Sequence, residues 1–281
     1  MNRSKRAIIA TETMQIVDQG WYESESAGRI EIKPQVDACL AGTRLYCPED
    51  FDSIDLGPAS NGPTAFEVGN ETTLAAGHRL VVERGEPRTL LLNFASAKNP
   101  GGGFLGGSQA QEESLARSSA LYASLQTQME YYTINRECKT AFYTDHMILS
   151  PAVPVFRNDA TDLLPAPYVV GMLTSPAVNA GAVLNSEPER AEEIAPVMAA
   201  RIANVLSVAA SEGYEQLVLG AWGCGVFRNE PETIADLFAE ALLGDSPFAG
   251  RFKRVVFAVL DNTADESIVG PFRCRFAGGT G

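Results

Sequence analysis

Residues 89–113 read "TLLLNFASAKNPGGGFLGGSQAQEE". The segment begins with an almost continuously apolar run, "TLLLNFA", which is typical of a strand covered on both faces of a sheet. Five glycines then occupy the seven positions from Gly101 to Gly107, and such a cluster indicates a backbone that bends tightly or approaches another group closely. A Gln-Glu-Glu triplet opens a helical pattern at Gln111. This succession of strand, glycine-rich loop and helix indicates an α/β fold.

The same alternation of apolar runs and helical patterns continues along the chain. We expect strands at Arg29–Ile32, Ala65–Val68, Thr89–Ala95, His146–Leu149, Tyr168–Leu173, Gln216–Ala221 and Arg254–Leu260. We expect helices at Lys5–Gln19, Thr72–Val82, Gln111–Gln126, Pro188–Ser211 and Pro231–Leu243. This order predicts an α/β protein with a parallel or mixed sheet between helices on both faces.

No internal repeat or interdomain linker divides the 281 residues, so we expect a single domain. Within it we place an N-terminal helical extension at about 1–65, a core at about 66–265 and a C-terminal tail at about 266–281. We find no run of about 18 apolar residues and no secretory signal, which predicts a cytoplasmic protein without a membrane span.

The composition excludes several classes of function. A formal net charge of −13 argues against broad contact with nucleic acid or anionic lipid, so an anionic ligand would have to be held by backbone N–H groups and helix N-termini. Five scattered cysteines without a Cys-x-x-Cys pair, and only two histidines, argue against a zinc site. Neither His78 nor His146 lies in a recognisable nucleophile motif.

A second glycine-rich loop, "LVLGAWGCGVFRNEPET", follows the strand predicted at Gln216–Ala221. It leads to a helix with Asn229 as a candidate N-cap and Pro231 in the first turn. Strand, glycine loop and helix together suit phosphate binding, although tight turns alone give the same pattern. Neither loop ends in Gly-Lys-Ser/Thr, which disfavours ATP or GTP hydrolysis. Each loop also contains an aromatic residue, Phe104 or Phe227, which suits either base stacking or core packing.

Glu112 and Glu113 fall in the first turn of the predicted helix. Successive helical side chains diverge by about 100°, so these two carboxylates cannot face each other across a glycosidic bond. If the pair is catalytic, one residue transfers the proton and the other holds substrate. The alternative is simple stabilisation of the helix dipole. The dipole lowers a glutamate pKa, whereas burial or a nearby diphosphate raises it.

The segment "GGGFLGGSQAQEE" resembles the signature of poly(ADP-ribose) glycohydrolases: three glycines, a seven-residue spacer and Gln-Glu-Glu. The segments "LLNFASAKNPGGG", "ILSPAVPVFRN", "LTSPAVN" and "LGAWGCGVFRN" look like the compact bacterial type of that family. The resemblance extends from "RAIIATETMQIV" to "VVFAVLD", which is most of the chain. It implies a macrodomain fold, a mixed sheet sandwiched between helices, that binds ADP-ribose.

The resemblance also implies the roles of individual residues. Glu113 would be the general acid/base, and Glu112 would hold ribose hydroxyls with support from Gln111. Asn99 would contact a distal-ribose hydroxyl. The first loop would lie against the distal ribose and the diphosphate; its glycines are Gly101, Gly102, Gly103, Gly106 and Gly107. The diphosphate would be cradled by the second loop, with Gly223, Cys224, Gly225, Val226 and Phe227.

The implied reaction is hydrolysis of the ribose–ribose bonds of poly(ADP-ribose), in which one carboxylate serves first as acid and then as base. No metal and no cofactor are implied. The implied partners are poly(ADP-ribose), ADP-ribose and ADP-ribosylated proteins, without direct nucleic-acid or membrane contact. The implied setting is reversal of ADP-ribosylation in the DNA damage response by a cytoplasmic monomer.

Three alternatives stay open. A macrodomain that only binds ADP-ribose is the first, although a pure reader has no chemical need for the glutamate pair. A hydrolase of mono-ADP-ribosyl linkages is the second. A nicotinamide-cofactor oxidoreductase is the last: Gly101, Gly103 and Gly106 form a Gly-x-Gly-x-x-Gly, but "AKNP" separates it from its strand. Cys224 lies near a helix N-terminus, which can lower a thiol pKa, but without a neighbouring base loop packing is the preferred interpretation.

Overall fold

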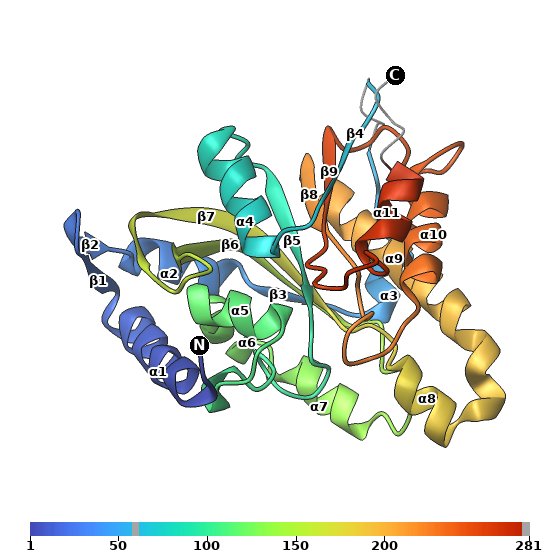
Figure 1. Ribbon diagram of the computed structural model, residues 1–281, viewed down its shortest axis with the longest axis horizontal. Helices are drawn as coiled ribbons and strands as arrows, with labels where there is room; N and C mark the ends of the chain where they lie inside the picture. Colours follow the sequence, from blue (N-terminus) through green and yellow to red (C-terminus); the bar gives the residue numbers. More distant parts are fainter. Residues whose placement is uncertain (58–61, 277–281) are drawn as a thin grey trace.

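The computed structural model describes residues 1–57 and 62–276. A seven-stranded sheet lies at the centre, with the strands in the spatial order β3-β6-β7-β5-β8-β9-β4 (Figure 1). Its strands are β3 (Arg44–Tyr46), β4 (Ala65–Gly69), β5 (Thr89–Phe94), β6 (Met147–Arg157), β7 (Leu163–Ser175), β8 (Gln216–Leu219) and β9 (Arg254–Ala258). A separate hairpin joins β1 (Trp21–Ser24) to β2 (Gly28–Glu31). The predicted mixed sheet is confirmed.

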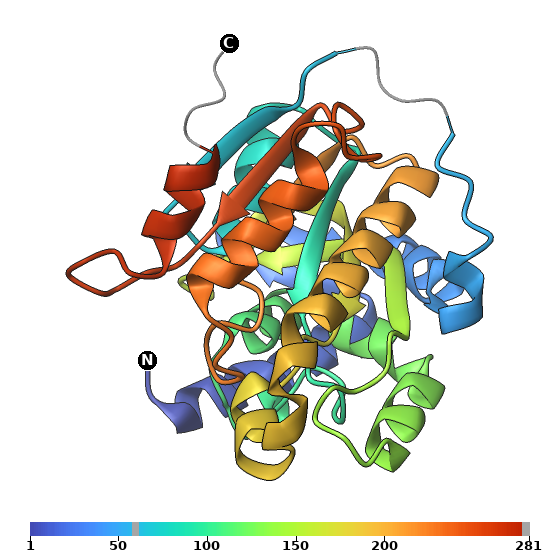
Figure 2. The same ribbon diagram turned by 90° about the vertical axis from the view of Figure 1, so that its right-hand side faces the viewer.

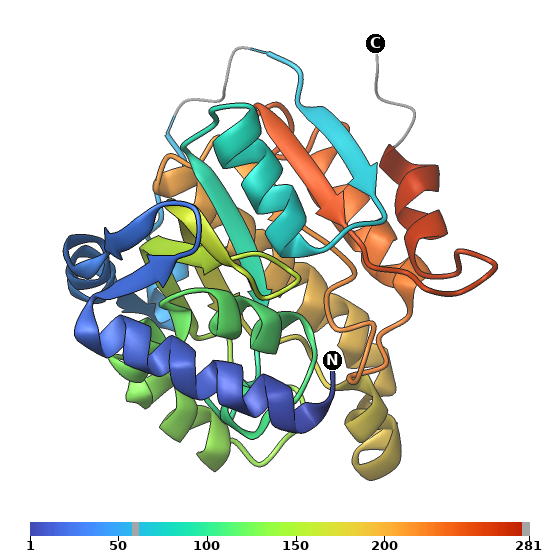
Figure 3. The same ribbon diagram turned by 60° about the vertical axis from the view of Figure 1, so that its left-hand side comes forward.

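Two layers of helices cover the sheet. Figure 2 shows the layer of α9 (Ile194–Ser211), α10 (Pro231–Leu242) and α11 (Val269–Phe276). Figure 3 shows the opposite side, which carries α2 (Lys33–Gly42), α4 (Thr73–His78), the π-helical turn Arg79–Glu83, α5 (Gln111–Ser118) and α6 (Leu121–Gln126), with α1 (Arg3–Gln19) lying across α5. The remaining helices are α3 (Pro48–Phe51), α7 (Met129–Glu137) and α8 (Ala180–Ser186). Each layer packs its own apolar cluster against the sheet.

Strand direction determines where loops gather. The strands β7, β5, β8, β9 and β4 run parallel to their neighbours in that order, whereas β3, β6 and β7 pair antiparallel. The carboxyl ends of the parallel strands therefore meet at one edge of the sheet, the usual position of a ligand in such folds. Both glycine-rich loops start at that edge, after β5 and after β8.

Several boundaries differ from the prediction because distant contacts set them. The helix expected at Gln111–Gln126 is divided into α5 and α6 at Ser119, whose backbone is extended and bridges to Val155. The backbone N–H of Ala120 donates to Pro154 of β6. The break thus adds a short backbone contact with β6, which the local sequence does not predict.

The two ends of the chain take part in the core. Strand β3 pairs with β6, so the expected N-terminal extension also supplies an edge strand to the sheet. The expected C-terminal tail is wrong for Val269–Phe276, which form α11; Phe272 and Phe276 are buried against Phe257 of β9. Val269, Phe272 and Phe276 recur at helical spacing, so the sequence does carry a local signal for this helix. The rest of that predicted tail, 277–281, lies outside the described residues.

By length and composition alone, the helical segment Pro188–Ser211 could cross a membrane. In the structure its apolar residues Met198, Ile202 and Val205 are buried in the core beside the sheet. Arg201, in the same helix, is 1% exposed and forms an ion pair with Asp145 at 2.8 Å. These contacts are those of a core helix.

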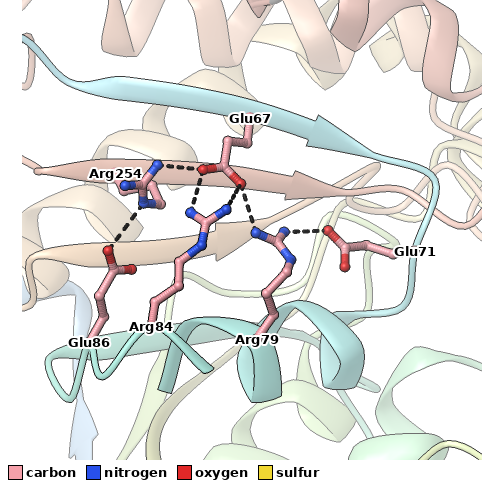
Figure 4. A network of polar contacts seen from close by, with 6 residues as sticks. All are labelled: Glu67, Glu71, Arg79, Arg84, Glu86 and Arg254. Carbon is pink, nitrogen blue, oxygen red and sulfur yellow. Dashed lines mark hydrogen bonds and ion pairs between the residues drawn. The ribbon is translucent and has the colours of Figure 1, made fainter. Parts of the chain in front are cut away.

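An ion-pair network braces the edge of the sheet beside α4 (Figure 4). Its centre is Glu67 of β4, which accepts hydrogen bonds from three arginines, Arg79, Arg84 and Arg254. Burial raises the Glu67 pKa, but the hydrogen bonds and charges of the arginines outweigh it and lower that pKa to about 2. Arg79 also donates to Glu71 at 2.6 Å, and Glu71 lines the cavity described next. The network therefore fixes one carboxylate of the cavity wall.

Candidate active site

A cavity of about 1020 Å³ opens at the carboxyl ends of the parallel strands. Its walls come from the loop after β5, the start of α5, the loop after β8 and the segment after β9. The N-terminal ends of α1 and α4 complete the rim. The cavity contains Gln111, Glu112 and Glu113 together with the second glycine loop, so the structure brings the two predicted motifs into one site.

Gly102 explains the glycine cluster. Its φ is +60°, and a Cβ there would lie 2.5 Å from Oε1 of Glu113 and 3.2 Å from Oε2 of Glu112. Any side chain at this position would displace the two carboxylates. Gly101 is constrained less tightly, with φ of +62° and 3.0 Å between an added Cβ and Tyr122. The backbone must therefore turn tightly and pass directly under the glutamates.

The other glycines of this loop shape it from outside the cavity. At Gly103 a Cβ would lie 2.4 Å from Oγ of Ser108, and at Gly107, where φ is +74°, it would lie 2.1 Å from the carbonyl oxygen of Arg3. Arg3 and Arg6 of α1 donate to the carbonyl oxygens of Gly106 and Gly107 at 2.8 and 2.7 Å. Of the predicted glycines in the first loop, only Gly102 lines the cavity, and Gly106 and Gly107 pack against α1. Phe104 is fully buried and packs against Tyr122.

Gln111 joins α5 to the sheet. Its Nε2 donates to the carbonyl oxygen of Leu92 at 2.7 Å, and its Oε1 accepts from the backbone N–H of Phe94 at 2.9 Å. The side chain thus continues the hydrogen bonding of β5 past Leu91, the last residue of β5 that pairs with β8. A further bond at 3.1 Å from Nε2 to the hydroxyl of Thr73 reaches α4. Gln111 therefore holds the two following glutamates in a fixed position.

Glu112 is a buried carboxyl, with 3% of its surface exposed. Its Oε2 accepts from the backbone N–H of Ser96 at 2.7 Å, and its Oε1 accepts from the buried amide of Asn93 at 3.3 Å. Burial raises the pKa of Glu112 to about 8; the hydrogen bonds oppose this rise, and the negative charge of Glu113 adds to it. At neutral pH the side chain consequently carries a proton.

Glu113 lies at the cavity surface. It is partly exposed, and its Oε1 accepts from the backbone N–H of Gly103 at 3.0 Å. Gly102 lies against both glutamates, so the pair shares one small volume although the two side chains leave the helix in different directions. The more accessible acid is thus Glu113, the predicted proton-transfer residue, and the buried one is its predicted helper.

The second loop presents its backbone to the cavity. Gly223 adopts φ of +78°, and an added Cβ would lie 2.5 Å from Nδ2 of Asn229. An added Cβ at Gly225 would meet nothing within 4 Å, and Val226 is 83% exposed. In the described part of the chain, the backbone N–H groups of Gly225, Val226 and Phe227 have no hydrogen-bond partner. Successive N–H groups of this kind form an anion-binding concavity.

Two local predictions for this loop have different outcomes. Asn229 is not the N-cap of α10, because the cap position is Glu230; the buried Asn229 amide instead donates to the carbonyl oxygens of Val178 and Gly223 at 2.8 and 3.2 Å. The tight turn at Gly223 draws this side chain inward. Burial raises the pKa of the Cys224 thiol to about 12, which agrees with loop packing and not with a reactive thiolate.

Comparisons with known proteins agree with this geometry. The sequence model for the catalytic domain of microbial-type PARG matches residues 10–158. The chain belongs to the microbial-type PARG family. No curated protein matches it.

Solved structures of poly(ADP-ribose) glycohydrolases (PARGs) extend the similarity over nearly the whole of this chain. Poly(ADP-ribose) glycohydrolase from Thermomonospora curvata is 46% identical, with a TM-score of 0.93, covering 98% of this chain and 100% of that one. The same protein bound to the inhibitor ADP-HPD is 47% identical with a TM-score of 0.91, covering 98% of this chain and 100% of that one. The poly(ADP-ribose) glycohydrolase from Deinococcus radiodurans in complex with ADP-ribose is 47% identical with a TM-score of 0.83, covering 89% of this chain and 99% of that one. The mixed sheet between helices is therefore the PARG fold.

Sequence reasoning missed several residues of the PARG-family cavity. Tyr143 adopts φ of +58° and lies with its ring centroid 6.0 Å from that of Phe227, and Lys98 lies 5.9 Å from the centre of the Tyr143 ring. Arg6 and Arg117 also line the cavity. These residues come from segments far apart in the chain; Lys98 stands in the quoted segment "LLNFASAKNPGGG" and Arg6 begins "RAIIATETMQIV", whereas the other two stand in none of the quoted segments. The predicted Asn99 does line the cavity and is exposed, and its carbonyl oxygen accepts from Gly102.

Proposed function

We propose that this chain is a poly(ADP-ribose) glycohydrolase that cleaves ribose–ribose O-glycosidic bonds and releases ADP-ribose, with Glu113 as general acid/base. The observation that carries the assignment of Glu113 is the carboxylate pair over Gly102, one acid accessible and one buried. Membership of the PARG family supports the substrate. The enzyme structure that matches in complex with ADP-ribose supports a ligand of that size in the cavity.

The first chemical step breaks the bond between the anomeric carbon of the terminal distal ribose and the 2′ oxygen of the next unit. Glu113 donates its proton to that oxygen, which leaves as a hydroxyl, and an oxocarbenium-like ribose develops. In the second step the Glu113 carboxylate takes a proton from water while the water oxygen bonds to the anomeric carbon. The carboxyl group is restored in its protonated form, so the cycle closes.

Glu112 can supply the proton for the first step. Burial raises the pKa of Glu112 to about 8, and the two side chains meet over Gly102. Glu112 is anchored by Ser96 and Asn93 and offers its remaining hydrogen-bonding capacity to ribose hydroxyls. Placing the proton on Glu113 leaves the charge on Glu112, which those two donors stabilise.

The diphosphate would be held by the second loop. The N–H groups of Gly225, Val226 and Phe227, which have no partner among the described residues, suit two phosphates, and the lack of a side chain at Gly225 lets the ligand approach the backbone. Such a site binds an anion although the whole chain has a formal net charge of −13. We further infer that the protein acts as a monomer in the cytoplasm on polymer attached to proteins, during reversal of ADP-ribosylation in the DNA damage response.

The test is Glu113→Gln, with Glu240→Gln, an exposed acid on α10, as the matched control. Wild type and control should release ADP-ribose from poly(ADP-ribose), quantified by chromatography, and Glu113→Gln should release none. Its affinity for ADP-ribose, measured by calorimetry, should stay within about tenfold, or about 1.4 kcal/mol. A fully active Glu113→Gln variant would contradict the role of Glu113. If wild type binds ADP-ribose without releasing any from polymer, the protein is a reader.

A further inference from the structure

Two arginines lie on the cavity wall beside Glu113. Arg6 comes from the first turn of α1 and Arg117 from α5. Glu113 and Arg117 are four residues apart on one helix, so both side chains lie on the same face, one turn apart. Burial lowers the pKa of Arg117, the charge of Arg6 lowers it further, and the charge of Glu113 opposes both effects. We call these residues the Arg6–Arg117 pair.

The Arg6–Arg117 pair has no carboxylate partner among residues 1–57 and 62–276. Arg117 is 2% exposed, and its guanidinium donates hydrogen bonds to the carbonyl oxygen of Ser108 at 3.3 Å and to the amide oxygen of Gln109 at 2.6 Å. Arg6 donates to the carbonyl oxygens of Gly107 and Met1, at 2.7 Å each. A buried cation without an ion pair, next to a second cation, lowers stability unless an anion joins it.

The stability of α1 does not explain why an arginine stands at position 6. Arg3, Lys5 and Arg6 stand in the first turns of α1, which has no acid in its first turn. Positive side chains at this end oppose the helix dipole, whose N-terminal end is itself positive. Of these three residues Arg6 lines the cavity, and in a chain with a formal net charge of −13 its position beside Arg117 therefore favours an anionic partner.

We propose that the Arg6–Arg117 pair binds the diphosphate of the leaving unit, the ADP-ribose next to the terminal one; this inference rests on the proposed function. The 2′ oxygen that Glu113 protonates belongs to a ribose whose 5′ carbon carries that diphosphate. The nearest phosphate must therefore lie within one sugar ring of Glu113, where Arg117 follows one helical turn later. The pair thus recognises the substrate as a polymer, because free ADP-ribose in the terminal position lacks this group.

The experiment compares Arg6→Gln with Lys5→Gln, which removes the same charge from an exposed position on the same turn of α1 outside the cavity. For Arg6→Gln we expect kcat/KM on poly(ADP-ribose) to fall about tenfold or more, the size of one charge-assisted hydrogen bond. The affinity for ADP-ribose should stay within about twofold, and the dependence of kcat/KM on salt should become shallower. Arg6→Lys should recover part of the lost rate. Lys5→Gln should behave as wild type.

The outcomes separate this inference from the proposed function. A wild type that releases no ADP-ribose overturns the proposed function itself. An active wild type with equal losses in Arg6→Gln and Lys5→Gln overturns the subsite and leaves only a general charge effect. If Arg6→Gln weakens ADP-ribose binding as much as polymer turnover, Arg6 acts through Gly107 on the terminal unit and the leaving-unit subsite is wrong. A substrate of only two ADP-ribose units should show the same loss as long polymer, since one leaving unit suffices; an unchanged rate on it would also refute the subsite.

Discussion

Replacing Glu112 by Gln should change how the stability of the fold depends on pH. The pKa of Glu112 is about 8, against an ordinary value of 4.5, because its carboxyl is buried. Between these two pH values the folded protein keeps a proton that the unfolded chain releases, so the free energy of unfolding of the wild type falls as pH rises through this window. Each pKa unit corresponds to about 1.4 kcal/mol, which gives an upper bound of about 5 kcal/mol lost above pH 8.

The Gln variant is uncharged at every pH and does not share that loss. At pH 5 it should be less stable than the wild type by about 1–3 kcal/mol. In the variant an amide NH₂ replaces one of the two oxygens that accept hydrogen bonds from Ser96 and Asn93, so two donors then face each other. At pH 9 it should equal or exceed the wild type. Urea unfolding at five pH values between 5 and 9 measures the difference, with Glu240→Gln as a control that should follow the wild type throughout. A difference between wild type and Glu112→Gln that is constant with pH would refute the reasoning, because Glu112 would then be ionised in the folded state.

Three further outcomes test other parts of the site. Gly102→Ala should lower the rate of polymer hydrolysis by about 10²-fold, since a Cβ at φ of +60° would lie 2.5 Å from the carboxylate of the proposed acid; an unchanged rate would mean that this carboxylate has room to move. Glu67→Gln should lower the free energy of unfolding by about 2 kcal/mol at pH 7 and by little near pH 2. The reason is that the stabilisation by the ion pairs of Glu67 is present above pH 4.5 and is lost as pH falls through about 2. Denaturant titration measures the loss, and an equal loss at both pH values would argue against ion pairing. Cys224, whose pKa is raised to about 12, should react with iodoacetamide at pH 8 far more slowly than the exposed Cys274, and equal labelling of the two by mass spectrometry would contradict the burial of Cys224.

The parts of the site that could be predicted are those written in consecutive residues. The helix start at Gln111 was placed correctly because acids in a first turn and the apolar spacing behind them are local signals. The strand before it was equally clear, since β5 is buried along almost its whole length and its sequence is apolar throughout. Sequence and structure agree wherever the determining contact lies within about one turn or one strand.

The rest depends on contacts between distant segments. The break of the helix at Ser119 follows from pairing with β6, and the inward turn of Asn229 follows from its bond to Val178. The proton on Glu112 is another example: its place at a helix start predicts a lowered pKa, and only its burial, a tertiary property, reverses the sign. Arg6 and Arg117 lie 111 positions apart in the chain, so no local pattern could have paired them.

The attachment of the first glycine loop to α1 has a consequence for the order in which the protein is made. The first helix leaves the ribosome early, but the carbonyl groups that Arg3 and Arg6 bind belong to residues 103 and 101 positions later. Contacts of such long sequence separation close late and slowly in folding. Until they close, nothing holds Gly107 against α1 or brings Arg6 beside Arg117. The pairing of β4 with β9, which joins Ala65 to Arg254, spans a still longer stretch of chain. Because α1 packs mainly on this loop and on α5, destabilising the first helix should yield a protein that is folded at its core yet inactive.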